Sequence, residues 1–206
     1  MQARNLIVLV GCQLISATAT ISLVTLGGII GMSLTSNKAF ATLPLSLMVV
    51  AVAASAIPAT MLMRRVGRKP GFVIAATIAA AGMFLGVLAL RYSSFTLFCA
   101  ATMLVGVNMA FTQQYRYAAA ESVRPEYVAR AISFVLLGPI GGAFLGKELA
   151  TRGQDWIAGR PHAGTLAALG GLFVLQAIVL LALREPDAHE EHETRRSDRP
   201  VREIIR

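Results

Sequence analysis

The sequence predicts an all-α membrane protein, a bundle of six transmembrane helices, and three observations support this fold class. Of the 206 residues, 55% are hydrophobic and only 15% are charged, whereas about 25% of residues in an average soluble domain are charged. Apolar runs of membrane-spanning length recur six times along the chain. Basic residues gather in the short links between these runs, which is typical of membrane topology.

Six segments are long and apolar enough to cross a bilayer, whose core of roughly 30 Å needs about 20 apolar residues per helix. They span residues 6–32, 39–63, 71–90, 95–118, 128–150 and 164–183. The first contains Ala17-Thr18-Ala19, which resembles a signal-peptide cleavage site, but its apolar run continues well past that point. Because a signal peptide has an apolar region of only about 7–15 residues, we expect an uncleaved first helix.

The composition changes after residue 183 and divides the chain into two parts. Residues 184–206 are mostly charged and contain Pro186 and Pro200, which predicts a disordered tail. Residues 1–183 form the predicted membrane domain. The side of the bundle that holds both termini carries fourteen Lys and Arg residues, against five on the other side. The positive-inside rule therefore predicts a multi-pass protein of the plasma (bacterial inner) membrane, with both termini and the tail in the cytoplasm.

The distribution of acidic residues argues against an enzyme. All eleven lie at or after Glu121, so the first 120 residues have neither paired catalytic carboxylates nor an acidic metal site. His189-Glu190-Glu191-His192 is one residue short of the H-E-x-x-H zinc motif and lies in the charged tail. We expect no cofactor, no metal and no nucleic-acid partner, because the basic residues follow membrane topology.

Polar residues within the predicted helices suggest a water-filled cavity, because polar groups are costly in lipid. They concentrate in the first and fourth helices, whereas the third and sixth are almost wholly apolar. We interpret the polar faces as lining a substrate cavity. The alternative for the hydroxyls is bonding to carbonyls of their own helix. The candidates are Gln13, Ser16, Thr20, Asn108, Thr112, Tyr115 and Arg116.

Charged residues near the helix ends leave several pairings open. Arg116 could pair with Glu121, bind an anionic group of a solute, or anchor the helix at the interface. Lys147 and Glu148 could form an interfacial pair or a gate, or could simply be solvated.

Glycines four residues apart predict close helix contacts in lipid. Three such sets occur, and they serve either packing within one bundle or a dimer surface. The sets are Gly27 with Gly31, Gly82 with Gly86, and Gly138 with Gly142 and Gly146.

The link between the second and third helices carries the most specific motif. Its sequence, Met63-Arg64-Arg65-Val66-Gly67-Arg68-Lys69, resembles the loop signature G-x-x-x-D-R-x-G-R-[RK] of the major facilitator superfamily. Arg65, Gly67, Arg68 and Lys69 match, which makes them candidates for a gating loop. Thr60 replaces the first glycine of the signature, and Arg64 replaces the acid that helps latch the two halves of such transporters.

Two further segments support the same resemblance. Gly138-Pro139-Ile140-Gly141-Gly142 is similar to the family signature G-P-x-x-G-G, one residue short, and marks Gly138, Pro139 and Gly142 as helix-bend candidates. Residues 115–121, Tyr-Arg-Tyr-Ala-Ala-Ala-Glu, resemble a bacterial branch that is connected with uptake of vitamins or small organic solutes.

The resemblance implies the N-terminal half of a twelve-helix transporter, in which two six-helix bundles rock about a central site. In that family the first and fourth helices line the cavity, and the third and sixth are peripheral. The second and fifth meet the other half, and here Pro44, Pro58 and the glycines from Gly138 to Gly146 would allow close packing. We therefore expect transport of a small solute by alternating access, with a second bundle supplied by a homo-oligomer or a separate chain. The alternatives are a non-transporting assembly or regulatory subunit and a truncated transporter remnant.

Overall fold

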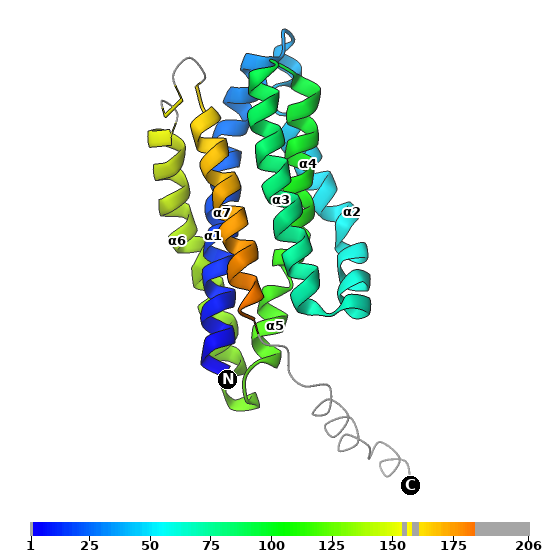
Figure 1. The fold of residues 1–206 in the computed structure, drawn as a ribbon, viewed down its shortest axis with the longest axis vertical. Coiled ribbons are helices and arrows are strands. Elements are labelled where there is room, and N and C mark those ends of the chain that lie inside the picture. Colours follow the sequence, from blue (N-terminus) through cyan, green and yellow to red (C-terminus); the bar gives the residue numbers. More distant parts are fainter. Residues whose placement is uncertain (1, 154–155, 158–160, 184–206) are drawn as a thin grey trace.

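The computed structural model describes residues 2–153, 156–157 and 161–183, and this part of the chain is all-helical (Figure 1). The predicted tail and its histidines lie outside the described residues. The long helices are α1 (Gln2–Leu34), α2 (Leu43–Val66), α3 (Arg68–Arg91), α4 (Phe95–Thr112), α6 (Val128–Arg152) and α7 (Ala163–Leu181). Short elements connect them: the helix α5 (Tyr115–Glu121) and the 3₁₀ turns η1 (Lys38–Phe40) and η2 (Pro125–Tyr127).

Six helical segments in the described part are long and apolar enough to cross a membrane. Their bounds are Arg4–Leu34, Lys38–Val66, Arg68–Arg91, Phe95–Glu121, Pro125–Arg152 and Ala163–Leu181. They match the six predicted segments within a few residues, so the predicted fold class is confirmed. The fourth segment is divided into α4 and α5 at Gln113 and Gln114, where the Gln114 N–H bonds to the Phe111 carbonyl three residues back. The sequence carries no glycine or proline at this break, which is why the pattern did not predict it.

The arrangement of the helices explains which surfaces remain open. α1 packs along α6, α3 packs against both α4 and α7, and α2 packs against α4. In Figure 1, α6 and α2 occupy opposite flanks of the bundle. Only 22% of the apolar window in each of these two flanking segments is buried, against 44–56% in the other four. α2 and α6 therefore present the largest apolar surfaces that this bundle leaves uncovered.

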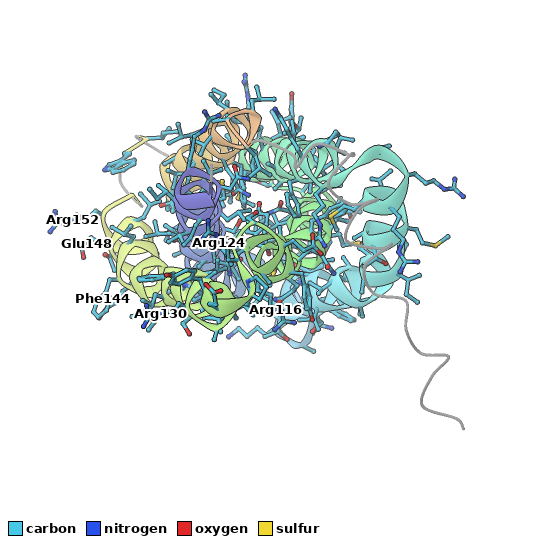
Figure 2. The ribbon with its side chains drawn as sticks, turned by 90° about the horizontal axis from the view of Figure 1, so that it is seen from below. Arg116, Arg124, Arg130, Phe144, Glu148 and Arg152 are labelled. Atoms are coloured by element: carbon cyan, nitrogen blue, oxygen red, sulfur yellow. The ribbon has the colours of Figure 1, made fainter. Side chains whose placement is uncertain are left out.

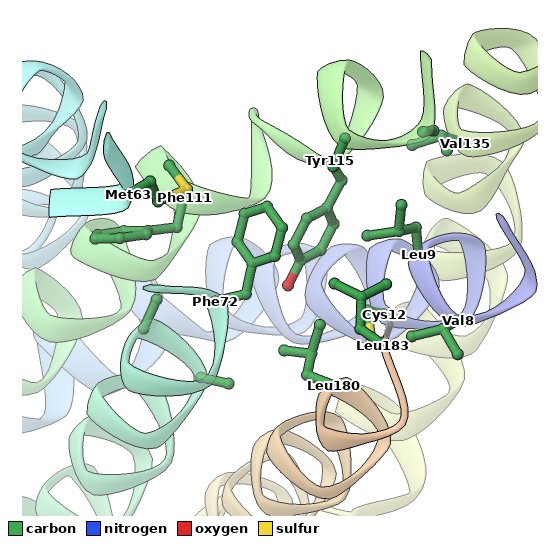
Figure 3. Packing of buried hydrophobic residues seen from close by; sticks show 14 of the residues in the cluster. Val8, Leu9, Cys12, Met63, Phe72, Phe111, Tyr115, Val135, Leu180 and Leu183 are labelled. Carbon is green, nitrogen blue, oxygen red and sulfur yellow. The ribbon is translucent and has the colours of Figure 1, made fainter. Parts of the chain in front are cut away.

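Two buried clusters form the core. One surrounds Phe72 and Tyr115 and also includes Met63 of α2, Phe111 of α4 and Val135 of α6 (Figure 3). The other is built around Leu23, Phe98 and Phe173. All six long helices contribute buried side chains to both clusters, so each of them runs through both ends of the core.

The glycine stripe of α6 packs inward against α1. A Cβ atom added to Gly142 would lie 2.5 Å from the Ala17 Cβ, and one added to Gly146 would lie 2.7 Å from the Thr18 carbonyl oxygen. The hydroxyl of Ser22 also donates a 2.7 Å hydrogen bond to the Gly146 carbonyl. Packing within one bundle is therefore confirmed for this set. The expectation that these glycines face a second half is wrong, because α1 already covers them.

The other glycine pairs are also used inside the bundle. Gly31 lies against the Ala41 carbonyl, and Gly82 lies against the Ala101 carbonyl and the Leu104 side chain. Pro44, another residue expected at the contact with a second half, is buried, and its carbonyl accepts a 2.8 Å hydrogen bond from Thr102. Pro58, by contrast, is exposed on α2.

Candidate solute-facing site

A buried chain of hydrogen bonds joins three of the helices. The Ser16 hydroxyl on α1 donates to the Gln176 Oε1 on α7 at 3.0 Å, and the Gln176 Nε2 donates to the Tyr115 hydroxyl at 2.8 Å. All three side chains are at most 4% exposed. The structure thus brings together Ser16 and Tyr115, two of the cavity candidates, through a third residue that the sequence analysis left out.

Gln176 is the member of this hydrogen-bond chain that the sequence-based candidates did not include, although a signal was present. It is the one strongly polar side chain within the long apolar run of α7, and a buried amide in lipid requires a polar partner. Its partners lie 160 and 61 residues away in sequence. Only the tertiary structure identifies them.

Tyr115 begins α5, immediately after the break that follows α4. Its ring meets Phe72 of α3 edge-to-face, with ring centroids 4.7 Å apart, and both rings are buried beside Leu9 and Cys12 (Figure 3). The ring packing and the bond from Gln176 together hold the start of α5 against α1, α3 and α7.

Buried amide atoms of two side chains lack hydrogen-bond partners in the described part of the chain. Both polar atoms of the Asn108 side chain are unpaired, as is Oε1 of Gln13. Asn108 is 1% exposed and shares the inward stripe of α4 with Val105 and Thr112 at spacings of three and four residues. Gln13 lies on α1 directly against Gly138 of α6. An unpaired buried polar group costs about 1–3 kcal/mol, so these amides have unused binding capacity.

Several threonine hydroxyls bond to carbonyls of their own helix, as the alternative interpretation of the polar residues expects. Thr18 donates to the Leu14 carbonyl at 2.9 Å, Thr25 to the Ile21 carbonyl at 2.8 Å, and Thr112 to the Met109 carbonyl at 2.9 Å. Each bond lies within the residue's own helix. Thr20 is half-buried on α1.

Arg116 and Glu121 do not form the pair that one sequence interpretation offered. Glu121 forms an ion pair with Arg68, which joins the end of α5 to the start of α3. The Arg116 guanidinium stacks over the Tyr117 ring, 5.0 Å from its centroid. Its Nε is buried and has no partner among the described residues. Figure 2 shows Arg116 on the same side of the bundle as Arg130 and Phe144, away from α7.

The motif between α2 and α3 forms a tight turn. The Gly67 N–H donates to the Met63 carbonyl at 3.0 Å, and its φ of 92° lies in the region that favours glycine. Arg65 is exposed, whereas Arg68 and Lys69 are half-buried. The matching residues of the motif are thus gathered at one end of the bundle, beside α5.

The helix-bend candidates lie in α6. The helix runs through Pro139 without a break, and Gly138 and Gly142 contact α1. Near its end, Glu148 pairs with Arg152 one turn later. The structure thus pairs Glu148 with Arg152 rather than with Lys147, which is exposed, as the solvated alternative expects.

The comparisons with known proteins agree with this geometry. A family model described as the Major Facilitator Superfamily matches residues 7–206. The chain is 32% identical to the riboflavin transporter RfnT of Brucella anthropi over 98% of its own length and 51% of that protein. It is 27% identical to the uncharacterized MFS-type transporter YdeG of Bacillus subtilis over 89% of the chain and 44% of that protein. The chain thus spans about half the length of the curated relatives it matches. No solved structure gives a significant match.

Proposed function

The chain belongs to the major facilitator superfamily, and from this premise we propose that it forms the N-terminal six-helix half of a transporter that moves a small solute by alternating access. The observation that carries the proposal is the match of this family to a bundle with six membrane-spanning segments. The family consists of transporters rather than enzymes. A single bundle supplies only one wall of a central cavity, so transport requires a second bundle.

The exposed faces of α2 and α6 support a contact with that second bundle. Large apolar side chains project from both helices, and four of them are Val49, Ile57, Ile140 and Phe144, which are 58–77% exposed. Lipid can cover such faces as well, so exposure alone does not identify the partner. A second six-helix segment that co-purifies with this chain, and that separates from it when Ile57 and Ile140 are changed to Trp, would support the contact.

For the solute we propose riboflavin or a chemically similar ring compound. The support is the likeness to a riboflavin transporter together with the unpaired amide of Asn108 and the unpaired Oε1 of Gln13. The flavin ring has an imide edge, with one N–H donor between two carbonyl acceptors. A carboxamide offers donors and an acceptor to match it. Arg116 adds donors at the end of the bundle that holds α5.

Substitution of Asn108 tests this assignment. We expect Asn108→Leu to weaken riboflavin binding by about 5- to 100-fold, because two hydrogen bonds are lost. The variant should unfold at an equal or higher temperature, since it removes an unpaired buried amide. Quenching of riboflavin fluorescence by the purified protein in detergent measures the binding.

Gln113→Leu is the matched control, because Gln113 is an exposed amide next to the same helix and its loss should leave binding unchanged. Unaltered binding in Asn108→Leu would remove Asn108 from the site. Absence of binding by the unmodified chain when it is associated with its second half would reject riboflavin as the solute.

A second prediction concerns Arg116. We expect Arg116→Ala to abolish uptake while membrane insertion stays normal, because the residue is a partner of the solute rather than of Glu121. Uptake of radiolabelled solute by cells that express the chain with its second half measures the effect. Normal uptake would show that Arg116 only anchors α5 at the membrane interface.

A non-transporting subunit is the second candidate function. The observation that favours it is Arg64, an exposed residue that replaces the acid of the loop signature. Such a subunit would bind a partner without moving a solute. Failure of uptake in the presence of a stably associated second bundle would support this alternative.

A further inference from the structure

An apolar groove opens at the surface of the bundle between α6 and α7, and its floor is formed by α1. The groove has a volume of about 350 Å³. This is within the usual range for ligand sites, about 300–1,000 Å³. Leu14, Ile15 and Thr18 of α1 line it, and the Thr18 hydroxyl is already bonded to the Leu14 carbonyl. The floor therefore presents no unsatisfied side-chain polar group.

Helix packing produces the groove. α6 and α7 each lie along α1 but make little contact with one another. Gly142 and Gly146 bring α6 very close to α1, so the leucines on the adjacent flank of α6, Leu145 and Leu149, face Leu172 of α7 across an open space.

The polarity of the residues that line the groove changes along the membrane normal. Its inner end, at Leu14 and Leu172, lies near the middle of α1 and α7. Its outer end lies in the last two turns of α6, where Glu148, Arg152 and Trp156 line the rim. From Leu145 to Arg152 the helix rises about 10 Å at 1.5 Å per residue, most of the half-thickness of a roughly 30 Å hydrocarbon core. The groove is apolar at mid-membrane depth and charged at the interface.

We propose that this groove binds one acyl chain of a zwitterionic phospholipid whose headgroup carries a primary ammonium, as in phosphatidylethanolamine. The apolar part matches the acyl chain, and it lies on a surface whose solvent is lipid. The rim matches the headgroup, because Arg152 can bind the phosphate and Glu148 the ammonium. A tryptophan ring is favoured at this depth.

The charges at the rim select this headgroup over others. Glu148 and Arg152 pair with each other, yet their side chains are 54% and 77% exposed, which leaves a carboxylate oxygen and several guanidinium donors free to bind. Figure 2 shows both at the edge of the bundle beside α6. A phosphatidylglycerol headgroup has no cation for Glu148, and phosphatidylcholine has no N–H to donate. Only an ammonium-bearing zwitterion satisfies both residues.

Trp156 makes a site-specific test possible, because it is the single tryptophan of the chain and lines the groove. The full chain is placed in phosphatidylcholine vesicles. Lipids brominated on their acyl chains, with ethanolamine, glycerol or choline headgroups, are then titrated as contact quenchers of its fluorescence. We expect the ethanolamine lipid to quench at a mole fraction about two- to fivefold lower than either other lipid, the range for exposed charge pairs.

Variants separate the two parts of the lipid. Glu148→Gln should reduce quenching by the ethanolamine lipid to the level of the choline lipid. Leu145 is a half-exposed residue that lines the groove. Leu145→Phe should reduce quenching by every lipid, because the larger side chain fills part of the groove. Arg130→Gln is the matched control, an exposed charge in the first turn of the same helix, and should change nothing.

Two results would overturn the proposal. Equal quenching by the three lipids in the unmodified chain would show that the rim does not select a headgroup. Absence of quenching by all of them would show that protein, such as a second bundle, covers the groove. Both quenching measurements are made without solute, so their outcomes are independent of the proposal that riboflavin is the solute.

Discussion

At the residue scale, Gln176 is a polar side chain whose hydrogen bonds connect three elements of the bundle. It accepts from Ser16 and donates to Tyr115, so one amide connects α1, α7 and the start of α5. All three groups are buried, and in an interior of low dielectric an unmade bond is costly. We infer that the chain of bonds sets the position of α5 relative to the rest of the bundle.

Replacement of Gln176 tests this role. Gln176→Leu leaves the Ser16 donor and the Tyr115 hydroxyl buried without their partner, and we expect a loss of about 1–3 kcal/mol in unfolding free energy. Thermal unfolding of the purified protein in detergent measures the change. A variant that also carries Ser16→Ala and Tyr115→Phe should recover most of the loss, because removing every partner is nearly neutral. Equal stability of Gln176→Leu and the unmodified chain would contradict the inference.

At the element scale, α6 is the helix whose glycine stripe packs against α1 while its opposite face stays exposed. Its glycines meet α1 at backbone distance, while bulky residues such as Phe134 and Phe144 remain exposed on the other side. Close backbone approach of this kind is a main source of helix association in lipid, where no hydrophobic effect operates between helices. The contact also determines the shape of the groove beside α7.

A side chain at Gly142 should separate α6 from α1. The added Cβ would meet the Ala17 Cβ and the Thr18 backbone nitrogen, neither of which can move aside without displacing α1. We expect Gly142→Ala to destabilise the fold by about 1–3 kcal/mol, measured by thermal unfolding in detergent. Gly171→Ala is the control, because that position has open space around it; a similar loss in both variants would contradict the packing argument.

At the scale of the whole molecule, an even number of spans places both ends of the described chain on one side of the membrane. The turn at Gly67, the α5 helix and the Arg68–Glu121 pair lie at that same end. Basic residues are far more numerous there than at the other end, and we expect that end to face the cytoplasm.

Cysteine labelling tests this orientation. Cys12 and Cys99 are buried, so a new exposed cysteine would be the accessible one among the described residues. In intact cells, a membrane-impermeant maleimide should label Ser36→Cys but not Glu126→Cys, because these exposed positions lie at opposite ends of the bundle. Labelling of Glu126→Cys alone would show that the membrane orientation is the opposite of the expected one.

Much of the fold was predictable because it depends on local composition. Each span is an apolar run bounded by polar residues, and both features are read within about 20 positions. The motif around Gly67 was also recognisable, because its φ of 92° requires glycine at one position in the turn. The break between α4 and α5 was not, since Gln113 and Gln114 carry no breaker signal.

The candidate site was predictable only in part. The polar residues of α1 and α4 were found, but their surroundings depend on how each helix is rotated. Ser16 and Tyr115 are buried against Gln176, whereas the Asn108 amide and the Gln13 Oε1 remain unpaired. Residues that share a predicted polar face thus have different roles.

By itself, the sequence determined the number and position of the membrane-spanning segments and the likeness to the transporter family, because hydropathy and turn motifs are properties of neighbouring residues. The tertiary structure alone decided which distant groups meet. Glu121 pairs with Arg68 rather than Arg116, and the α6 glycines face α1 rather than a second half. These outcomes depend on helix rotation and separation, which the packing of the whole bundle sets and no single segment encodes.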